Sequence, residues 1–144
     1  MTTTDREVEN RLQQHQVRYT TGRRAVVNSL ASAPGPRSAA ELHAEIGASV
    51  PLSSLYRSLT VLEESGVVQL HFGAKGITRY ELAEWLKGHH HHLICINCGS
   101  VDDIELPHPV EQRVRALVGD IGSMSSFMPI NHALEIEGRC GSCL

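Results

Sequence analysis

Two Cys-x-x-Cys pairs constrain the fold of this chain more than any other feature. The first pair is Cys95 and Cys98, the second is Cys140 and Cys143, and the chain has no other cysteine. Four thiolates can complete a tetrahedral shell around Zn²⁺ and leave no open coordination position, which is typical of a structural site. The alternative is a dithiol redox centre, which needs only one such pair at a helix N-terminus. The two pairs therefore predict a structural zinc ion that joins both ends of the second half of the chain.

Four consecutive histidines, His89 to His92, stand just before the first cysteine pair. In an extended strand, neighbouring side chains point to opposite faces, so His90 and His92 should share one face and His89 and His91 the other. Each face then carries a chelating pair, and the run predicts two further metal sites. Nitrogen and oxygen donors suit Fe²⁺, Mn²⁺, Zn²⁺, Co²⁺ or Ni²⁺, and donor type alone does not choose among them.

Each histidine pair needs further donors from elsewhere in the chain. The candidates beside the even-numbered histidines are Glu81, His71 and Asp103, and those beside the odd-numbered ones are Glu111 and His132. Taken singly, each of these residues is more often a solvated side chain than a ligand. His132 is the best of them, because apolar residues surround it in the sequence.

The first half of the chain has the pattern of a winged helix-turn-helix. Helices are expected over residues 6–15, 21–30, 39–46 and 51–64, followed by strands over 67–72 and 77–82. Either Thr20 or Thr21 can cap the second of these helices, and Ser38 with Glu41 forms a capping box for the third. Residues 73–76 should join the two strands as a hairpin that forms the wing.

The helix that follows Pro51 would enter the major groove of DNA. Arg57 can donate two hydrogen bonds to guanine, and the ring of Tyr56 can contact a thymine methyl group. Ser53 and Arg57 fall on a face away from the apolar stripe of this helix, and Arg18 and Arg23 are basic residues that could contact phosphate. Without the wing, a half-buried Tyr56 and a solvated Arg57 would be the simpler interpretation.

The second half predicts a small α/β unit after a linker over residues 83–88. Strands are expected over 93–94, 101–106 and 132–137, a helix over 110–118, and a loop over 119–129. No apolar run approaches the length of a membrane helix, and the N-terminus has no secretory apolar region. We therefore expect a cytoplasmic protein without a membrane partner. In that compartment paired cysteines are more typical of metal sites than of disulfides.

Two other classes of protein could use such ligands. One is a small zinc hydrolase with Glu81 as general base, and the other is a metal-storage protein. Aromatic residues make up only 4% of the chain, which leaves little from which to build a substrate pocket. A storage protein would have no use for the winged-helix half. We therefore expect a regulator rather than an enzyme.

Together, these motifs resemble the ferric uptake regulator family in type and order. The matching segments are Leu55-Tyr56-Arg57-Ser58-Leu59, Gly66-Val67-Val68, Tyr80-Glu81-Leu82, the histidine run with Leu93-Ile94-Cys95-Ile96-Asn97-Cys98-Gly99, His132, and Cys140-Gly141-Ser142-Cys143. The resemblance implies a homodimeric, metal-dependent repressor of metal uptake and homeostasis genes. A winged-helix domain (residues 1–82) would bind an inverted-repeat operator in double-stranded DNA. A hinge (83–88) would connect it to an α/β dimerisation domain (89–144) that contains the four-cysteine zinc site. The whole chain would then have an α+β fold.

The resemblance also implies roles for particular residues. Glu81, His90 and His92, with Asp103 nearby, match the regulatory site between the domains, which would hold Fe²⁺ or Zn²⁺, with Mn²⁺ or Ni²⁺ also compatible. A further site in the dimerisation domain corresponds to His89, His91, Glu111 and His132. The four cysteines match the structural zinc, and Arg18, Arg23, Tyr56 and Arg57 match DNA contacts.

The chain departs from the family pattern at two places. Pro36-Arg37 stands where many iron sensors have a regulatory histidine, and His71 on the wing is our candidate to replace it. Glu81 and Ala83 stand where zinc sensors often have a cysteine. A peroxide-sensing, iron-dependent repressor of the same fold is the alternative.

Overall fold

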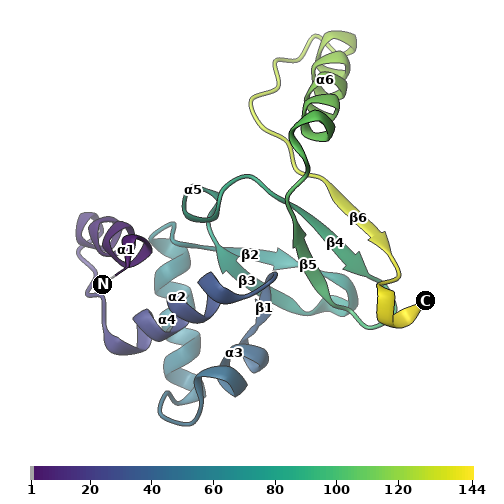
Figure 1. Cartoon of the computed structure of the whole chain (residues 1–144). Coiled ribbons are helices and arrows are strands. Elements are labelled where there is room, and N and C mark those ends of the chain that lie inside the picture. Colours follow the sequence, from purple (N-terminus) through teal and green to yellow (C-terminus); the bar gives the residue numbers. More distant parts are fainter. Residues whose placement is uncertain (1) are drawn as a thin grey trace.

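The computed structural model describes residues 2–144, so Met1, where the predicted N-terminal domain begins, lies outside the described residues. The chain forms two parts, each built on its own three-stranded sheet (Figure 1). The N-terminal part contains α1 (Thr3–Gln14), α2 (Thr21–Ser32), β1 (Arg37–Ser38), α3 (Ala39–Ile46), α4 (Leu52–Glu64), β2 (Val68–Phe72), a 3₁₀ turn (Ala74–Gly76) and β3 (Thr78–Leu82).

Polar side chains begin α2 and α3 where the sequence predicts. Thr20 rather than Thr21 caps α2, because its side-chain oxygen accepts a hydrogen bond from the Arg23 backbone N–H at 3.3 Å. The capping box of α3 is confirmed: Ser38 Oγ accepts from the Glu41 N–H at 3.1 Å, and the Glu41 carboxylate accepts from the Ser38 N–H at 3.0 Å. These caps satisfy amides that the first helical turn leaves free.

The apolar core lies in the N-terminal part. Leu55, Leu59 and Leu62 of α4 are fully or almost fully buried, as their helical spacing predicts. They pack with apolar side chains of α1, α2 and the wing, including Leu12, Val27 and Val68. Because one face of α4 is committed to this core, its opposite face is left free for other contacts.

The wing has three strands in the order β1-β3-β2 rather than the two predicted. The extra strand, β1, is only two residues long and pairs Arg37 with Tyr80. Such a short strand has no alternating pattern, so the sequence does not reveal it. Glu81 on β3 is paired with Gln69 on β2.

The C-terminal part contains α5 (Glu84–Lys87), β4 (His91–Cys95), β5 (Val101–Ile104), α6 (His108–Met124), β6 (Glu135–Gly138) and a 3₁₀ turn (Gly141–Cys143). Its sheet has the order β5-β4-β6, with β4 antiparallel to β5 and parallel to β6. The central strand is therefore β4, which begins within the histidine run, at His91. Among the described residues, no helix is both long enough and apolar enough to cross a membrane.

Two predictions for the C-terminal part were wrong, and the expected linker contains one helical turn, α5, over residues 84–87. Residues 119–124, expected as loop, continue α6. The last strand covers 135–138 instead of 132–137. Glycines at 119 and 122 favour a loop, but the chain turns back directly over Gly122. A Cβ there would lie 2.6 Å from the Phe127 carbonyl oxygen, so the site requires glycine for packing.

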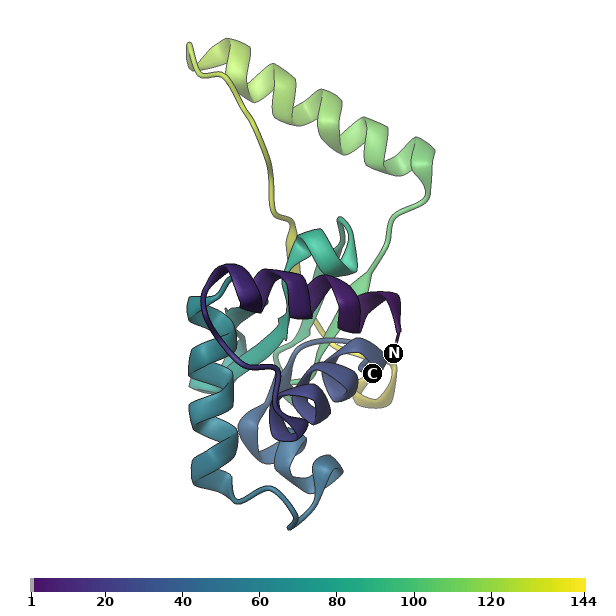
Figure 2. The ribbon, with the colours of Figure 1, turned by 90° about the vertical axis from the view of Figure 1, so that its left-hand side faces the viewer.

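Helix α6 stands apart from the other elements of the chain (Figures 1 and 2). Leu117, Ile121 and Met124 lie along one face of it and are exposed, Met124 by 84%. An apolar face of this kind on a helix that packs against little else indicates a surface that a partner covers.

Candidate metal centres and nucleic-acid interface

The four cysteines converge at one end of the second sheet. Cys95 ends β4, Cys98 lies in the turn after it, and Cys140 and Cys143 lie just beyond β6. Their sulfur atoms all lie within 4.8 Å of one another, and none is in a disulfide. The Sγ atoms of Cys98 and Cys140 are 3.8 Å apart. A tetrahedral site with Zn–S bonds of about 2.3 Å has an edge of about 3.8 Å, so the thiol set fits a zinc ion.

Backbone groups favour the thiolate form of Cys95. The N–H groups of Cys98 and Cys140 point at the Cys95 sulfur from 3.5 and 3.4 Å. These hydrogen bonds lower the pKa of Cys95 to about 5. A side-chain hydrogen bond with Cys143 raises the pKa of Cys140 to about 11, because it favours the protonated thiol. A zinc ion bound by both sulfurs would replace that shared proton.

A second cluster joins the wing to the second sheet. Glu81 comes from β3, His90 and His92 from the histidine run at β4, and Asp103 from β5. His92 Nε2 lies 2.8 Å from one oxygen of Glu81, and His90 Nε2 lies 3.2 Å from the other. The same two nitrogens lie 3.3 and 3.5 Å from Asp103 Oδ1. This set of two imidazoles and two carboxylates, which we call the Glu81 cluster, is suited to a divalent metal with nitrogen and oxygen ligands.

The electrostatics of the Glu81 cluster favour opposite charges inside it. Burial by itself would lower the pKa of His92, but hydrogen bonds with Asp103 and Glu81 outweigh it and raise that pKa to about 9. Burial by itself would raise the pKa of Asp103, whereas contacts with His92 and Lys87 lower it to about 2. Asp103 is therefore held ionised among positive partners.

A third cluster lies on the opposite face of β4. His89, His91 and His132 surround Glu111, with His89 and His132 Nε2 atoms 2.8 and 3.0 Å from its Oε1. His91 Nε2 lies 2.8 Å from its Oε2. Burial alone would raise the pKa of Glu111, but the hydrogen bonds from His91 and His89 lower it to about 2. Three imidazoles and one carboxylate make a second nitrogen and oxygen donor set, which we call the Glu111 cluster.

The alternation of the histidine run thus places its members as predicted, with the Glu81 cluster on one side and the Glu111 cluster on the other. His71, predicted beside Glu81, instead has Glu135 of β6 as its nearest carboxylate, with Nε2 2.9 Å from Oε1. Its ring lies 4.5 Å from the ring of His92. Glu135 was not predicted, because only the register between β4 and β6 brings it opposite His92. A sequence of unknown strand pairing carries no signal for it.

The free face of α4 carries the predicted DNA contacts. Ser53, Tyr56 and Arg57 are exposed, Tyr56 by 48%. Arg18 is also exposed, and its backbone carbonyl accepts a hydrogen bond from Arg23 Nη1 at 2.7 Å. The guanidinium groups of Arg57 and Arg18 have no carboxylate partner within salt-bridge distance among the described residues, so both can contact phosphate or bases.

The neighbouring Arg24 differs from these two. It lies 3.4 Å from Asp5 and 4.3 Å from the centre of the Tyr19 ring, and its role is to hold α1 against α2.

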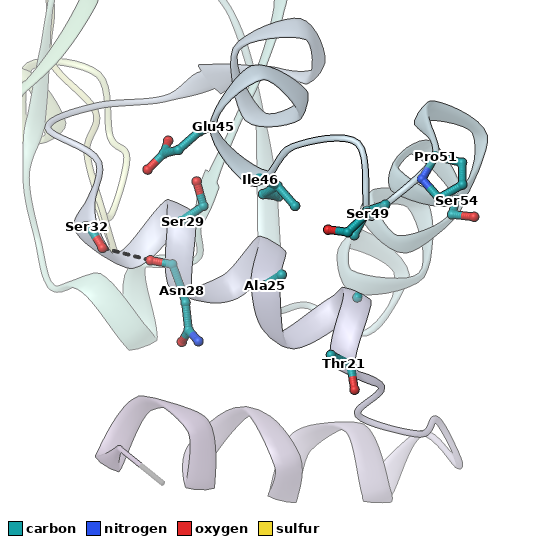
Figure 3. Close-up of a pocket in the computed structure, with 12 residues that line it drawn as sticks. Thr21, Ala25, Asn28, Ser29, Ser32, Glu45, Ile46, Ser49, Pro51 and Ser54 are labelled. Atoms are coloured by element: carbon teal, nitrogen blue, oxygen red, sulfur yellow. Dashed lines mark hydrogen bonds between the residues drawn. The ribbon is translucent and has the colours of Figure 1, made fainter.

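A hollow of about 640 Å³ lies between α2 and the loop that leads into α4 (Figure 3). Thr21, Ile46 and Pro51 are among the side chains around it, and Ser32 donates a hydrogen bond to the Asn28 carbonyl at its edge, at 2.9 Å. None of the metal-ligating or DNA-contacting residues named above lines it. This hollow is therefore separate from the candidate metal centres and the candidate DNA contacts.

Comparisons with known proteins point to one family. A model of the ferric uptake regulator family matches residues 14–136. The ferric uptake regulation protein of Campylobacter jejuni is 33% identical over 138 residues, which cover 92% of this chain and 83% of that protein.

Solved structures resemble this chain in fold. The Helicobacter pylori ferric uptake regulator, described as having three functional metal binding sites, matches with a TM-score of 0.75 and 24% identity, covering 98% of this chain and 91% of that one. The Vibrio cholerae regulator, described as showing rearrangement of its DNA-binding domains, matches with a TM-score of 0.68 and 26% identity, covering 92% and 98%. The predicted fold class, an N-terminal DNA-binding domain followed by an α/β dimerisation domain with four clustered cysteines, is thereby confirmed.

Proposed function

Because this chain belongs to the ferric uptake regulator family, we propose that it is a homodimeric transcriptional repressor whose binding to an inverted-repeat operator depends on a regulatory metal. Members of this family are metal-responsive, DNA-binding transcription regulators that form dimers, and they are not enzymes. The finer assignments to this chain are our proposal: repression, control of metal uptake and homeostasis genes, and action in the cytoplasm.

The observation that carries the proposal is the position of the Glu81 cluster. Its donors come from the wing on one side and from the second sheet on the other, so both parts of the chain meet in it. Two hydrogen bonds support the same junction. The Asp103 N–H donates to the Pro34 carbonyl at 3.0 Å, and Arg79 Nη2 donates to the Gly99 carbonyl at 3.0 Å. A divalent ion bound there would be coordinated by residues of both parts and would hold them together.

The chain's own residues then set the geometry of DNA binding. Glu81 would attach β3 to the metal, and His90 and His92 would attach β4 to it. When no metal joins these donors, the hinge over residues 83–88 would permit other arrangements of the two parts. A ligand shifts such an equilibrium only as far as it prefers one arrangement. In a dimer, the two α4 helices must be spaced to match operator half-sites, about one helical turn of DNA or a small multiple apart.

The three donor sets suit different roles. We assign structural Zn²⁺ to the four cysteines, because their shell would be closed. We assign Fe²⁺ or Zn²⁺ to the Glu81 cluster, and its donors also suit Mn²⁺ and Ni²⁺. Glu111 lies in the first turn of α6, so the Glu111 cluster ties that helix to β4 and would support the dimer. His71, with Glu135, holds the wing to β6 beside the regulatory site.

The experiment that tests the proposal is a DNA-binding titration on the zinc-replete dimer. Fe²⁺, Mn²⁺, Zn²⁺ and Ni²⁺ are added separately, without oxygen, against a library of inverted-repeat duplexes. We expect one metal to strengthen binding by about 5- to 150-fold, the usual range of allosteric coupling. Equal DNA binding with every metal and with none would refute the metal-dependent mechanism.

Replacing Arg57 with alanine should weaken binding to the operator without changing metal binding. A bidentate contact between arginine and guanine accounts for about 1–3 kcal/mol of discrimination, so affinity should fall about 5- to 150-fold and selectivity at one base should relax. Fluorescence anisotropy with matched and single-base-substituted duplexes measures both effects. Arg115→Ala is the control, because Arg115 is exposed on α6 in the other part of the chain and its position in the helical repeat is opposite the apolar face of that helix. Equal losses in the two variants would point to general charge rather than base recognition.

A further inference from the structure

Lys87 is the last residue of α5, in the hinge between the two parts of the chain. Its side chain is only 18% exposed, and its ammonium nitrogen is buried inside the Glu81 cluster. That nitrogen contacts Asp103 Oδ2 and lies 3.9 Å from Glu81 Oε2. The chain has one other lysine, Lys75, which is exposed in the turn of the wing. Lys87 is thus the lysine whose charge lies among candidate metal ligands.

An ammonium and a divalent metal ion compete for the same carboxylate oxygens. Asp103 Oδ2 can face Lys87 or a metal, and two cations a few ångströms apart in a poorly hydrated site repel strongly. The histidines differ from Lys87, because a neutral imidazole nitrogen can itself bind the metal and because at Asp103 their nitrogens lie 3.3 and 3.5 Å from Oδ1, whereas Lys87 contacts Oδ2. Lys87 therefore partly neutralises Glu81 and Asp103 without needing a metal.

We propose that Lys87 is a tethered competitor of the regulatory metal: its ammonium group holds the carboxylates of the Glu81 cluster until a divalent cation displaces it. The lysine then sets the metal concentration at which the regulator responds. This inference rests on the proposed role of the Glu81 cluster as the regulatory site. The cluster would then contain ligands that bind the metal and one residue, Lys87, that weakens this binding.

The position of Lys87 also connects its displacement to the hinge. The backbone N–H of Lys87 donates to the Ala83 carbonyl at 3.1 Å, which completes the single turn of α5. Gly88 follows with a φ of 88°, a conformation that favours glycine, and directs the chain into the histidine run. In Figure 1, α5 lies where the chain passes from β3 to β4. Withdrawal of the ammonium therefore removes a contact between the hinge and β5.

The main test compares three variants of the zinc-replete dimer. Lys87→Met removes the charge with little change in length, Lys87→Arg keeps a cation, and Lys75→Met removes the same charge elsewhere. Mn²⁺ serves as the probe, and its affinity is measured by competition with a chelator. We expect Lys87→Met to bind Mn²⁺ at least tenfold more tightly, since one nearby cation changes proton binding by a carboxylate about 10- to 1000-fold. Lys75→Met should match the wild type.

The sign of the effect separates competition from an ordinary ion pair. If Lys87 only stabilised the fold, Lys87→Met would unfold more easily and bind Mn²⁺ with equal or lower affinity, and the proposal would be wrong. The affinity measurement needs no DNA. A wild type that binds Mn²⁺ but shows no metal-dependent DNA binding would therefore refute the proposed function and leave the competition testable.

A second measurement uses the wild-type protein alone and does not depend on the folding of a variant. Acetylation by acetic anhydride, followed by mass spectrometry, reports how accessible each lysine is. We expect Lys87 to be protected without Mn²⁺ and to react several-fold faster with it, while the reactivity of Lys75 stays constant as an internal reference. Unchanged protection of Lys87 on saturation with Mn²⁺ would overturn the displacement.

Discussion

Replacing Cys140 with serine is expected to unfold the C-terminal part of the chain and abolish the dimer, while the N-terminal helices remain folded. The apolar core belongs almost entirely to the N-terminal part. All four residues of β6 are exposed, so burial of apolar surface contributes little to holding this strand. Its attachments are its pairing with β4, a hydrogen bond from the Ile96 N–H to the Gly138 carbonyl at 2.8 Å, and the cysteine cluster.

The expected effect is large because a structural zinc ion contributes folding free energy directly. Zinc-finger peptides gain about 10–16 kcal/mol from the metal at neutral pH, as much as the whole stability of a typical domain. Light scattering should show monomers, elemental analysis should show loss of one zinc per chain, and circular dichroism should show helix retained with the sheet signal reduced. Ser142→Ala, in the same turn, keeps all four thiols and is the control. A Cys140→Ser dimer with wild-type thermal unfolding would refute a structural role for the cluster.

Local chemistry made much of the fold and the clusters predictable from the sequence. The capping box at Ser38 and Glu41 depends on residues three apart, and the buried stripe of α4 depends on helical spacing. The separation of His90 and His92 from His89 and His91 depends only on the alternation of a strand. Each of these features can be predicted without knowing which distant segments of the chain pack together.

The features that the sequence did not reveal depend on distant segments. Glu135 approaches His71 because β4 and β6 pair in one particular register, and β1 exists because two residues reach β3. Lys87 enters the Glu81 cluster because α5 turns back toward β5. The length of α6 depends on the close passage of residues 127–129 over Gly122, which overrides the low helix propensity of glycine.

Strand β4 has a particular place in the mechanism because it carries ligands of all three clusters. Its two faces lead to the Glu81 and Glu111 clusters, and Cys95 at its end leads to the zinc site. The Glu111 cluster reaches α6, whose exposed apolar face we propose as the contact with the partner subunit, and the Glu81 cluster reaches the wing. In that proposal a change in either donor set acts on the same strand, which would provide a physical route between dimerisation and DNA binding.

Replacing Glu81 with glutamine should abolish the response to metal while preserving the fold. Glu81 is 4% exposed and faces both His90 and His92, so it is the wing residue that belongs to the proposed regulatory donor set. Glutamine has the same shape but lacks the charge that balances a cation. Metal affinity at this site should fall at least a hundredfold, and operator affinity with metal should fall to the metal-free value, a loss of about 5- to 150-fold.

Three measurements on Glu81→Gln decide whether the cluster is regulatory. Chelator competition gives metal affinity, anisotropy gives DNA affinity with and without metal, and thermal unfolding reports the fold. His90→Ala should behave in the same way, because it removes a donor from the other side of the junction. Glu105→Gln removes an exposed carboxylate two residues from Asp103 and should leave all three measurements unchanged. If Glu81→Gln unfolds, or if it still binds DNA in a metal-dependent manner, then Glu81 does not couple the wing to the second sheet through a metal.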